Sequence, residues 1–204
     1  MSTKFASASA SSSIRAPALP CNATEAKTQQ DRPRRGLVIV HTGDGKGKST
    51  AAFGLAILGL GRGKAVKIHQ FMKVPSPQPG EHRIFAGFGI QIEGLGDGFS
   101  WKSRDPERSA QSARQGWNRA EATIRAGKHF LVVLDEITYS LRYGWIPLEA
   151  VLQCLRERPG HVHVVLTGRN APAELLQLAD TVTEMRLIKH HHDAGVPAQH
   201  GIED

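Results

Sequence analysis

A glycine-rich stretch that ends in lysine and hydroxyl residues, His41–Thr50, has the residue types and spacing of a phosphate-binding loop. Alternate glycines let a backbone turn tightly and direct several N–H groups inward toward an anion. Lys48 can reach the phosphates, and the hydroxyl of Ser49 or Thr50 can bind Mg²⁺, the usual partner of a polyphosphate. The strict Walker A pattern has glycine at the position of Thr42, so the first glycine comes one residue late. The alternative interpretation is a flexible turn with an incidental lysine.

Two acids, Asp135 and Glu136, directly follow the apolar run Phe130–Leu134. This pattern is typical of a Walker B strand, whose carboxylates emerge at the strand end where α/β sheets bind ligands. One such carboxylate can hold Mg²⁺ directly or through water. Alone, the run fits a solvated strand end equally well. Together with the glycine-rich loop, it favours a nucleotide site.

The elements that must position these residues alternate between strand and helix. Leu37–Val40 is apolar on both faces, which indicates a buried parallel strand before the loop, and Ser49–Leu60 is typical of a helix packed on a sheet. A helix begins at Asp105-Pro106, where Asp caps and Pro opens the first turn, and ends at Gly127. The alternation predicts an α/β fold with a mainly parallel sheet flanked by helices and right-handed crossovers. The other expected elements are strands Ala65–Phe71, Phe130–Leu134, His161–Leu166 and Thr181–Leu187, helices Pro147–Arg156 and Ala171–Leu178, and an irregular connection Lys73–Gly98 with a short strand near Ile90–Ile92.

Composition and charge exclude several classes of protein. The chain has 204 residues, 40% of them hydrophobic, and contains no apolar run of about 18 residues, so we expect one globular domain and no membrane span. Cys21 and Cys154 are too few for a disulfide scaffold or a four-cysteine zinc module. Residues 1–35 carry +4 of the formal net charge of +7, and the remaining +3 does not indicate a nucleic-acid partner.

The N-terminal segment differs in composition from the rest. Its first thirteen residues contain six Ser and three Ala, and no acid precedes Glu25. We expect residues 1–35 to be disordered or weakly ordered and the P-loop domain to span residues 36–204. The two cysteines suit a reducing compartment, and we expect a cytoplasmic protein. The Ser/Ala-rich start is also the composition of a transit peptide, which leaves organelle import as the alternative.

Taken together, the motifs resemble the P-loop-type ATP:corrinoid adenosyltransferases, which act on cob(I)alamin or cob(I)yrinic acid a,c-diamide. The shifted glycine pattern is that family's form of the loop, and the motifs occur in family order over about residues 36–203. They are Val40–Ala52, Gln70–Lys73, Gly80-Glu81, Gly98–Trp101, Leu134–Tyr139, Arg158–His161, Leu166–Asn170, Leu178–Asp180, Lys189-His190, Asp193–Val196 and Ala198–Glu203.

The resemblance implies a RecA-like P-loop fold and a reaction in which a cobalt(I) corrinoid attacks the 5′ carbon of ATP and triphosphate leaves. It implies catalytic roles for Lys48 and Glu136 and places Phe99 and Trp101 against the lower face of the corrin ring. By matched position, Mg²⁺ is held by Ser49, Asp135 and Glu136. ATP is contacted by Thr42, Gly43, Asp44, Gly45, Lys46, Gly47, Lys48, Ser49, Thr50, Lys73, Glu81 and Arg169.

The resemblance also implies a homodimer, and we expect neither a nucleic-acid nor a membrane partner. The basic cluster Arg32–Arg35 is interpreted as a solvated charge run, with electrostatic contact to an acidic reductase such as a flavodoxin as the alternative. Two other functions fit the loop alone: a kinase or ATPase that acts at the γ-phosphate, and a nucleotide-gated regulatory protein without turnover. We interpret Trp117 as a core residue, Cys154 as inert, and the triplet His190–His192 as exposed imidazoles rather than a metal site.

Overall fold

Six parallel strands form one sheet in the computed structural model, which describes residues 34–73, 79–90, 92–94 and 106–202. The strand order is β3-β2-β4-β5-β1-β6. All strand pairs are parallel, so the expected α/β class and parallel sheet are confirmed. The strands are β1 (Val38–Thr42), β2 (Val66–Gln70), β3 (Glu93–Gly94), β4 (Leu131–Asp135), β5 (His163–Thr167) and β6 (Thr181–Glu184).

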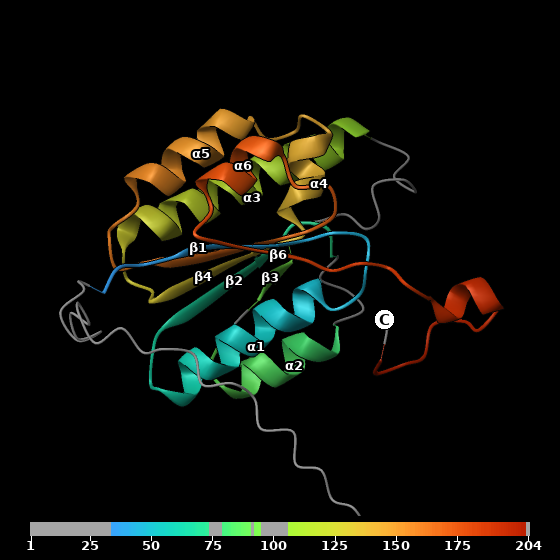
Figure 1. Ribbon diagram of the computed structural model, residues 1–204. Helices are drawn as coiled ribbons and strands as arrows, with labels where there is room; N and C mark the ends of the chain where they lie inside the picture. Colours follow the sequence, from blue (N-terminus) through green and yellow to red (C-terminus); the bar gives the residue numbers. More distant parts are fainter. Residues whose placement is uncertain (1–33, 74–78, 91, 95–105, 203–204) are drawn as a thin grey trace, which may run out of the picture. The chain divides into compact units, whose positions relative to one another are not determined.

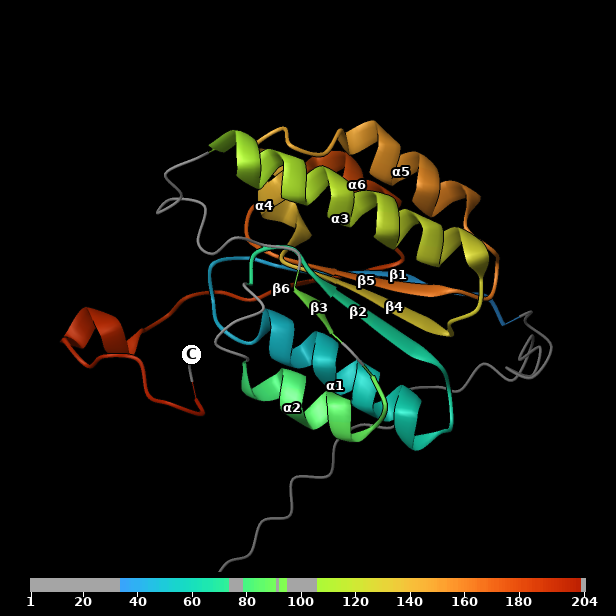
Figure 2. The same ribbon diagram turned by 180° about the vertical axis from the view of Figure 1, so that it is seen from behind.

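Helices cover both faces of the sheet. Figures 1 and 2 show α1 and α2 on one face and α3, α4, α5 and α6 on the other. None of the helices in the described ranges combines the length and apolar character that crossing a bilayer needs. The helices are α1 (Lys48–Gly61), α2 (Gly80–Gly87), α3 (Pro106–Ala126), α4 (Ile137–Arg142), α5 (Leu148–Glu157) and α6 (Ala173–Leu178), followed by the short 3₁₀ helix η3 (His191–Ala194).

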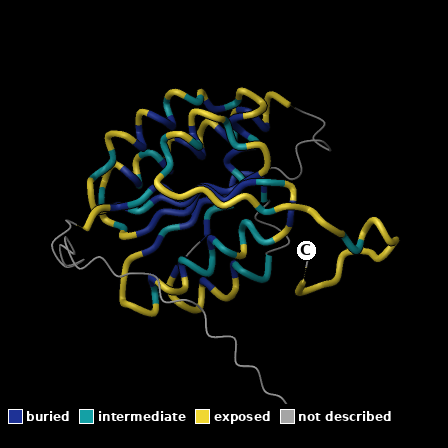
Figure 3. Tube along the Cα trace, viewed as in Figure 1, coloured by how far each residue is buried: buried dark blue, intermediate teal, exposed yellow. Residues whose placement is uncertain are grey.

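Alternate residues of the central strands contribute to two separate hydrophobic cores. In β4, Val132 and Leu134 pack with α3 and α5, whereas Leu131 and Val133 pack on the side of α1. Trp117 of α3 is 5% exposed and belongs to the first core, as expected. The strands form the most deeply buried layer in Figure 3, while β6 at the edge is exposed along its length. Polar residues can therefore reach a ligand only where the strands end.

Several sequence expectations need correction. The segment expected to be irregular contains α2, which is held by its buried His82 and Phe85 rather than by a strong periodic pattern. Helix α4, which was not expected, follows directly after Glu136. Six residues rarely form a helix without tertiary contacts, and α4 has them because four of its six residues are buried. The last strand ends at Glu184 instead of Leu187, and β3 lies just after Ile90–Ile92. Residues 1–33 and Asp105 lie outside the described residues, so the expectations made for them stay predictions.

A close approach of backbone and side chain joins β5 to α4. Gly168 has φ +139°, and a Cβ added there would lie 1.9 Å from Thr138 Oγ1. The same hydroxyl donates to the carbonyl of Arg169 at 2.8 Å, so it cannot move away without losing that bond. Only glycine fits at this corner of the sheet.

We expect Gly168→Ala to lower the free energy of unfolding by about 2–4 kcal/mol, because strain at positive φ adds to a steric clash. Gly144 is the matched control: its φ is +67° but open space surrounds it, so Gly144→Ala should cost about 1 kcal/mol. Urea unfolding of both variants would measure the difference. Equal losses would contradict the role given to Thr138.

Candidate active site

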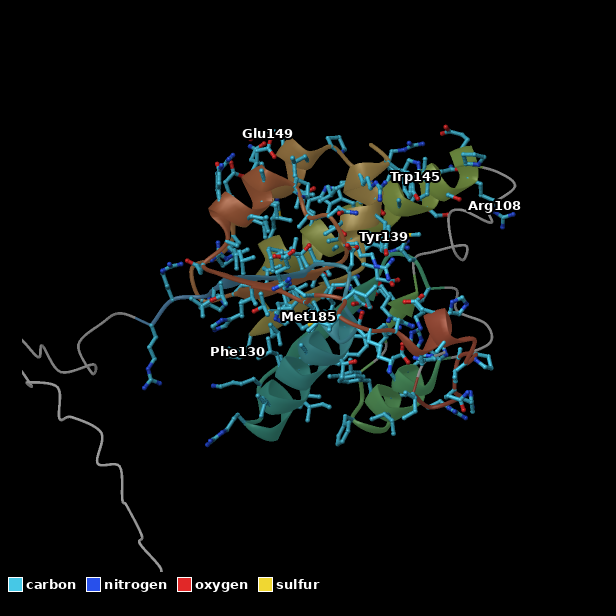
Figure 4. All side chains as sticks on the ribbon, turned by 45° about the vertical axis from the view of Figure 1, so that its right-hand side comes forward. Arg108, Phe130, Tyr139, Trp145, Glu149 and Met185 are labelled. Atoms are coloured by element: carbon cyan, nitrogen blue, oxygen red, sulfur yellow. The ribbon has the colours of Figure 1, made fainter. Side chains whose placement is uncertain are left out.

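The glycine-rich loop runs from the end of β1 into α1, as expected. Gly43 and Gly47 have φ of +91° and +102°, and Gly47 is the residue that precedes α1. The amide of Gly45 donates to the carbonyl of Met185 at 2.6 Å, and the Met185 amide donates to the carbonyl of Thr42 at 2.9 Å. The segment after β6, where Figure 4 labels Met185, is therefore hydrogen-bonded to the loop.

The loop has no room for a side chain at Gly43 or at Gly45. A Cβ on Gly43 would lie 2.5 Å from the Met185 carbonyl oxygen, and one on Gly45 would lie 2.7 Å from the Arg186 carbonyl oxygen. Gly43 is thus required by backbone conformation and by close packing, Gly45 by packing against residues 185–186, and Gly47 by its positive φ. This packing is compatible with a loop whose first glycine is Gly43, one residue later than the first glycine of a strict Walker A loop.

Positive charge gathers at the loop and at the start of α1. Helix α1 has fourteen residues and no acid in its first turn, so the partial positive charge of its N-terminus is not offset there. Lys48 is half-buried and donates from Nζ to the carbonyl of Gly45 at 2.5 Å. Burial lowers the pKa of the Lys48 ammonium, and the nearby guanidinium of Arg169 lowers it further. A bound polyanion would relieve this repulsion, which makes the loop a favourable place for phosphates.

The two acids expected to form the Walker B end differ in their surroundings. Asp135 is 1% exposed, and its Oδ1 accepts from the Thr167 hydroxyl at 2.7 Å. Glu136 is only partly buried and has a left-handed backbone with φ +61°, which is uncommon for a residue with a side chain. Burial, and then the neighbouring Asp135, raise the pKa of the Glu136 carboxyl to about 7, although Lys73 and Lys48 oppose the shift.

Other predicted site residues gather around these acids. Lys73 Nζ lies 3.7 Å from Glu81 Oε1, and both groups act on the titration of Glu136. Arg169 Nε lies 4.0 Å from Asp44 Oδ1 at the loop. These two residues also border a hollow of about 440 Å³, whose other lining residues are Glu184, Arg186 and Leu187. Ser49 and Thr50 lie in the first turn of α1. Phe99 and Trp101 lie outside the described residues.

Sequence reasoning gave no role to four residues at this edge of the sheet, although three of them lie within the quoted motifs. Gln70 and Thr167 end β2 and β5, and both are fully buried. Tyr139, which Figure 4 labels on α4, is half-buried close to Arg169 and Glu136. His82 lies in the helix that was not expected. A polar residue at the end of an apolar strand would have revealed the first two, whereas no local signal points to His82.

Cys154 agrees with its interpretation as inert. It is fully buried on α5, and burial raises the pKa of its thiol to about 11. At neutral pH the group is therefore a protonated, inaccessible thiol.

Comparison with known proteins identifies one family over almost the whole chain. The family described as ATP:corrinoid adenosyltransferase BtuR/CobO/CobP matches residues 34–203. The corrinoid adenosyltransferase of Escherichia coli K12 is 41% identical over 179 residues, which cover 88% of this chain and 91% of that protein. The corrinoid adenosyltransferase CobA of Salmonella typhimurium LT2 has the same identity and coverage. The corrinoid adenosyltransferase of Pseudomonas aeruginosa PAO1 is 40% identical, over 87% of this chain and 88% of its own length.

The raised pKa of Glu136 predicts a pH-dependent effect of its removal. The folded protein keeps this proton up to about pH 7, whereas the unfolded chain loses it near pH 4.5, so the carboxyl costs stability as the pH rises between these values. We expect Glu136→Gln to stabilise the protein by on the order of 2 kcal/mol more at pH 8 than at pH 5.

Urea unfolding at both pH values would measure this effect. Glu149→Gln serves as the control, because Glu149 is exposed on α5, where Figure 4 labels it. A stability difference for Glu136→Gln that is the same at pH 5 and pH 8 would contradict the raised pKa.

Proposed function

We propose which residues carry out the reaction of the ATP:corrinoid adenosyltransferase family, to which this chain belongs and which transfers an adenosyl group from ATP to a corrinoid. They are the glycine-rich loop, the acids at the C-terminal end of β4 and the acid in the first turn of α2. Cobalt(I) of the corrinoid attacks the 5′ carbon of ATP. A cobalt–carbon bond forms, the bond from that carbon to its oxygen breaks, and triphosphate leaves with the bonding electrons. The nucleophile carries no proton, so the step needs no general base.

The observation that carries this proposal is the concentration of positive charge at the loop. The leaving group is a whole triphosphate, so negative charge grows on the oxygen next to the 5′ carbon as the bond breaks. Loop amides, the α1 N-terminus and Lys48 would already be in place to stabilise that charge. Lys48 would exchange its bond to the Gly45 carbonyl for one to a phosphate oxygen, whose negative charge would favour the ammonium form that burial disfavours.

The residues present also suit Mg²⁺. Ser49 offers a hydroxyl in the first turn of α1, and Glu136 a carboxyl beside Asp135 whose charge a cation would favour. No three His, Cys, Asp or Glu side chains converge within the described residues, so substrate oxygens and water would complete the shell, as Mg²⁺ commonly requires. Bound there, magnesium would offset phosphate charge. The two oxygens of Asp135 already accept hydrogen bonds, so this acid would act mainly through water.

The remaining site residues have roles that fit their surroundings. Arg169 lies next to Asp44 of the loop and would contact phosphate, since its guanidinium can bind two oxygens at once. Lys73 and Glu81 form a pair near Glu136, and we assign them contacts to the nucleotide. Phe99 and Trp101 would cover the lower face of the corrin ring and exclude an axial ligand of cobalt.

The proposal also includes an oligomeric state, an electron donor and a cellular location. We propose a homodimer, a flavodoxin-type protein as the electron donor that reduces cobalt(II), and a cytoplasmic location. Within the basic segment Arg32–Arg35, Arg35 pairs with Asp180, and Arg32 and Arg34 would offer such an acidic donor an electrostatic contact. Two cysteines and relatives from bacteria support the location.

The central test is an anaerobic incubation of the protein with ATP, Mg²⁺ and chemically reduced cob(I)alamin. We expect adenosylcobalamin and equimolar triphosphate by chromatography, and a rate at least about 100-fold lower for Lys48→Ala, because a preplaced charge at the leaving oxygen is lost. Lys64→Ala is the matched control, since Lys64 is exposed beyond the other end of α1. ADP and phosphate with unchanged corrinoid would instead indicate a kinase or ATPase.

Replacement of Phe99 and Trp101 by alanine should separate reduction from transfer. With cob(I)alamin supplied, we expect the double variant to keep its transfer rate within severalfold. With cob(II)alamin and a reduced flavodoxin, we expect the product to be lost, because a ligand below cobalt makes its reduction harder. Phe88→Ala, which removes an exposed aromatic ring, controls for general effects. Equal losses in both assays would contradict the proposed role.

A further inference from the structure

A continuous chain of buried polar groups joins α2 to the acids of the site. His82 Nε2 lies 2.5 Å from Gln70 Oε1, and Gln70 Nε2 donates to Asp135 Oδ2 at 3.0 Å. The Thr167 hydroxyl donates to Asp135 Oδ1 at 2.7 Å and accepts from the amide of Glu136 at 2.9 Å. The four side chains before Glu136 are at most 5% exposed. The chain therefore crosses β2, β4 and β5 out of contact with water.

The direction of every hydrogen bond in this chain follows from the donors and acceptors available. The amide nitrogen of Gln70 faces two carboxylate oxygens, since Glu81 Oε1 lies 3.3 Å from it, so Gln70 Oε1 must accept from His82. His82 thus carries its proton on Nε2. Thr167 has one hydroxyl proton and gives it to Asp135, so the same oxygen can only accept from Glu136.

A hydrogen-bond chain in which every donor and acceptor has only one allowed role fixes the groups at its ends. Removing one donor leaves a buried acceptor unpaired, which costs more than the bond itself contributes. Gln70 holds the Asp135 carboxylate on β4 and the Glu81 carboxylate in the first turn of α2 through the same amide nitrogen. Thr167 holds the backbone of Glu136, which has the left-handed conformation that only a well-supported residue keeps.

We propose that Gln70 and His82 are positioning residues for the transfer reaction. They touch no reacting atom. Gln70 places the carboxylates of Asp135 and Glu81 relative to each other, and His82 orients Gln70 by donating from Nε2. This inference rests on the proposed function, in which Asp135 and Glu81 act on the Mg²⁺–nucleotide complex. It adds a residue of α2 that no local sequence signal identified.

The test compares two replacements of His82. Glutamine can place an N–H near the position of Nε2 and keep the donor, whereas methionine fills similar space without a donor. We expect His82→Met to lower kcat for adenosyl transfer about tenfold or more and His82→Gln to restore most of it, because supporting hydrogen bonds to metal-site acids have effects of this size. The KM for the corrinoid should change little in either variant.

A second readout does not depend on turnover. Calorimetry without corrinoid measures the Kd of ATP once with Mg²⁺ present and once with EDTA present. The ratio of the two Kd values is the factor by which Mg²⁺ tightens ATP binding. We expect this factor to fall about tenfold in His82→Met and to stay near wild type in His82→Gln, since the disturbed acids act on the metal and not on the loop. If the wild type binds Mg²⁺–ATP but makes no adenosylated corrinoid, the proposed function fails, while the comparison of the two variants still decides this inference.

Two controls separate positioning from stability. His163 accepts from the Leu37 amide at 3.2 Å near the opposite end of the sheet, so His163→Met removes a comparable histidine bond away from the acids. Thr167→Val and Thr167→Ser repeat the comparison on β5 should the His82 variants fail to fold. The inference is overturned if the methionine and glutamine variants of His82 behave alike, or if His163→Met lowers kcat and the Mg²⁺ effect as much as His82→Met does.

Discussion

Burial of both faces of the parallel sheet is the constraint on which the rest of this structure depends. Helices exclude water from Val132, Leu134 and their neighbours on one side and from Leu131 and Val133 on the other. Among the described residues, the buried polar side chains of the strands are confined to the last two residues of each strand. Because all strands are parallel, their carboxyl ends meet at one edge, and there the register sets Gln70 beside Asp135. The chemistry is therefore confined to this edge.

That edge combines two opposite electrostatic environments at close range. The loop side has Lys48, Arg169 and the start of α1, where burial and mutual repulsion disfavour the charged form of Lys48. The side at the end of β4 has Asp135 and Glu136, where burial and the neighbouring acid disfavour the charged form of Glu136. A polyphosphate with its cation would satisfy both sides, since each of its charges meets the opposite one. This is the physical reason to associate the fold with ATP.

The buried hydrogen-bond chain explains how carboxylate side chains, which rotate easily, can serve a site that needs fixed geometry. Carboxylates rotate readily in water, but Asp135 accepts one hydrogen bond on each oxygen. Glu136 is fixed at its backbone instead, which leaves its side chain directed by its surroundings alone. Neither acid is fixed by neighbours in sequence. The partners come from β2 and β5, on either side of β4.

The sequence by itself determined the fold class, the loop, the Asp135-Glu136 pair and the family, because glycine spacing, apolar runs and acids at strand ends are local patterns. Tertiary structure decided the rest. Helices α2 and α4 are too short to form from local preference and depend on burying Phe85, Ile137 and Leu141. Gln70 and Thr167 carry only the local signal of a polar residue at a strand end, and His82 carries none. Their hydrogen-bond partners were set when segments distant in sequence came together, because a hydrogen bond depends on position in space.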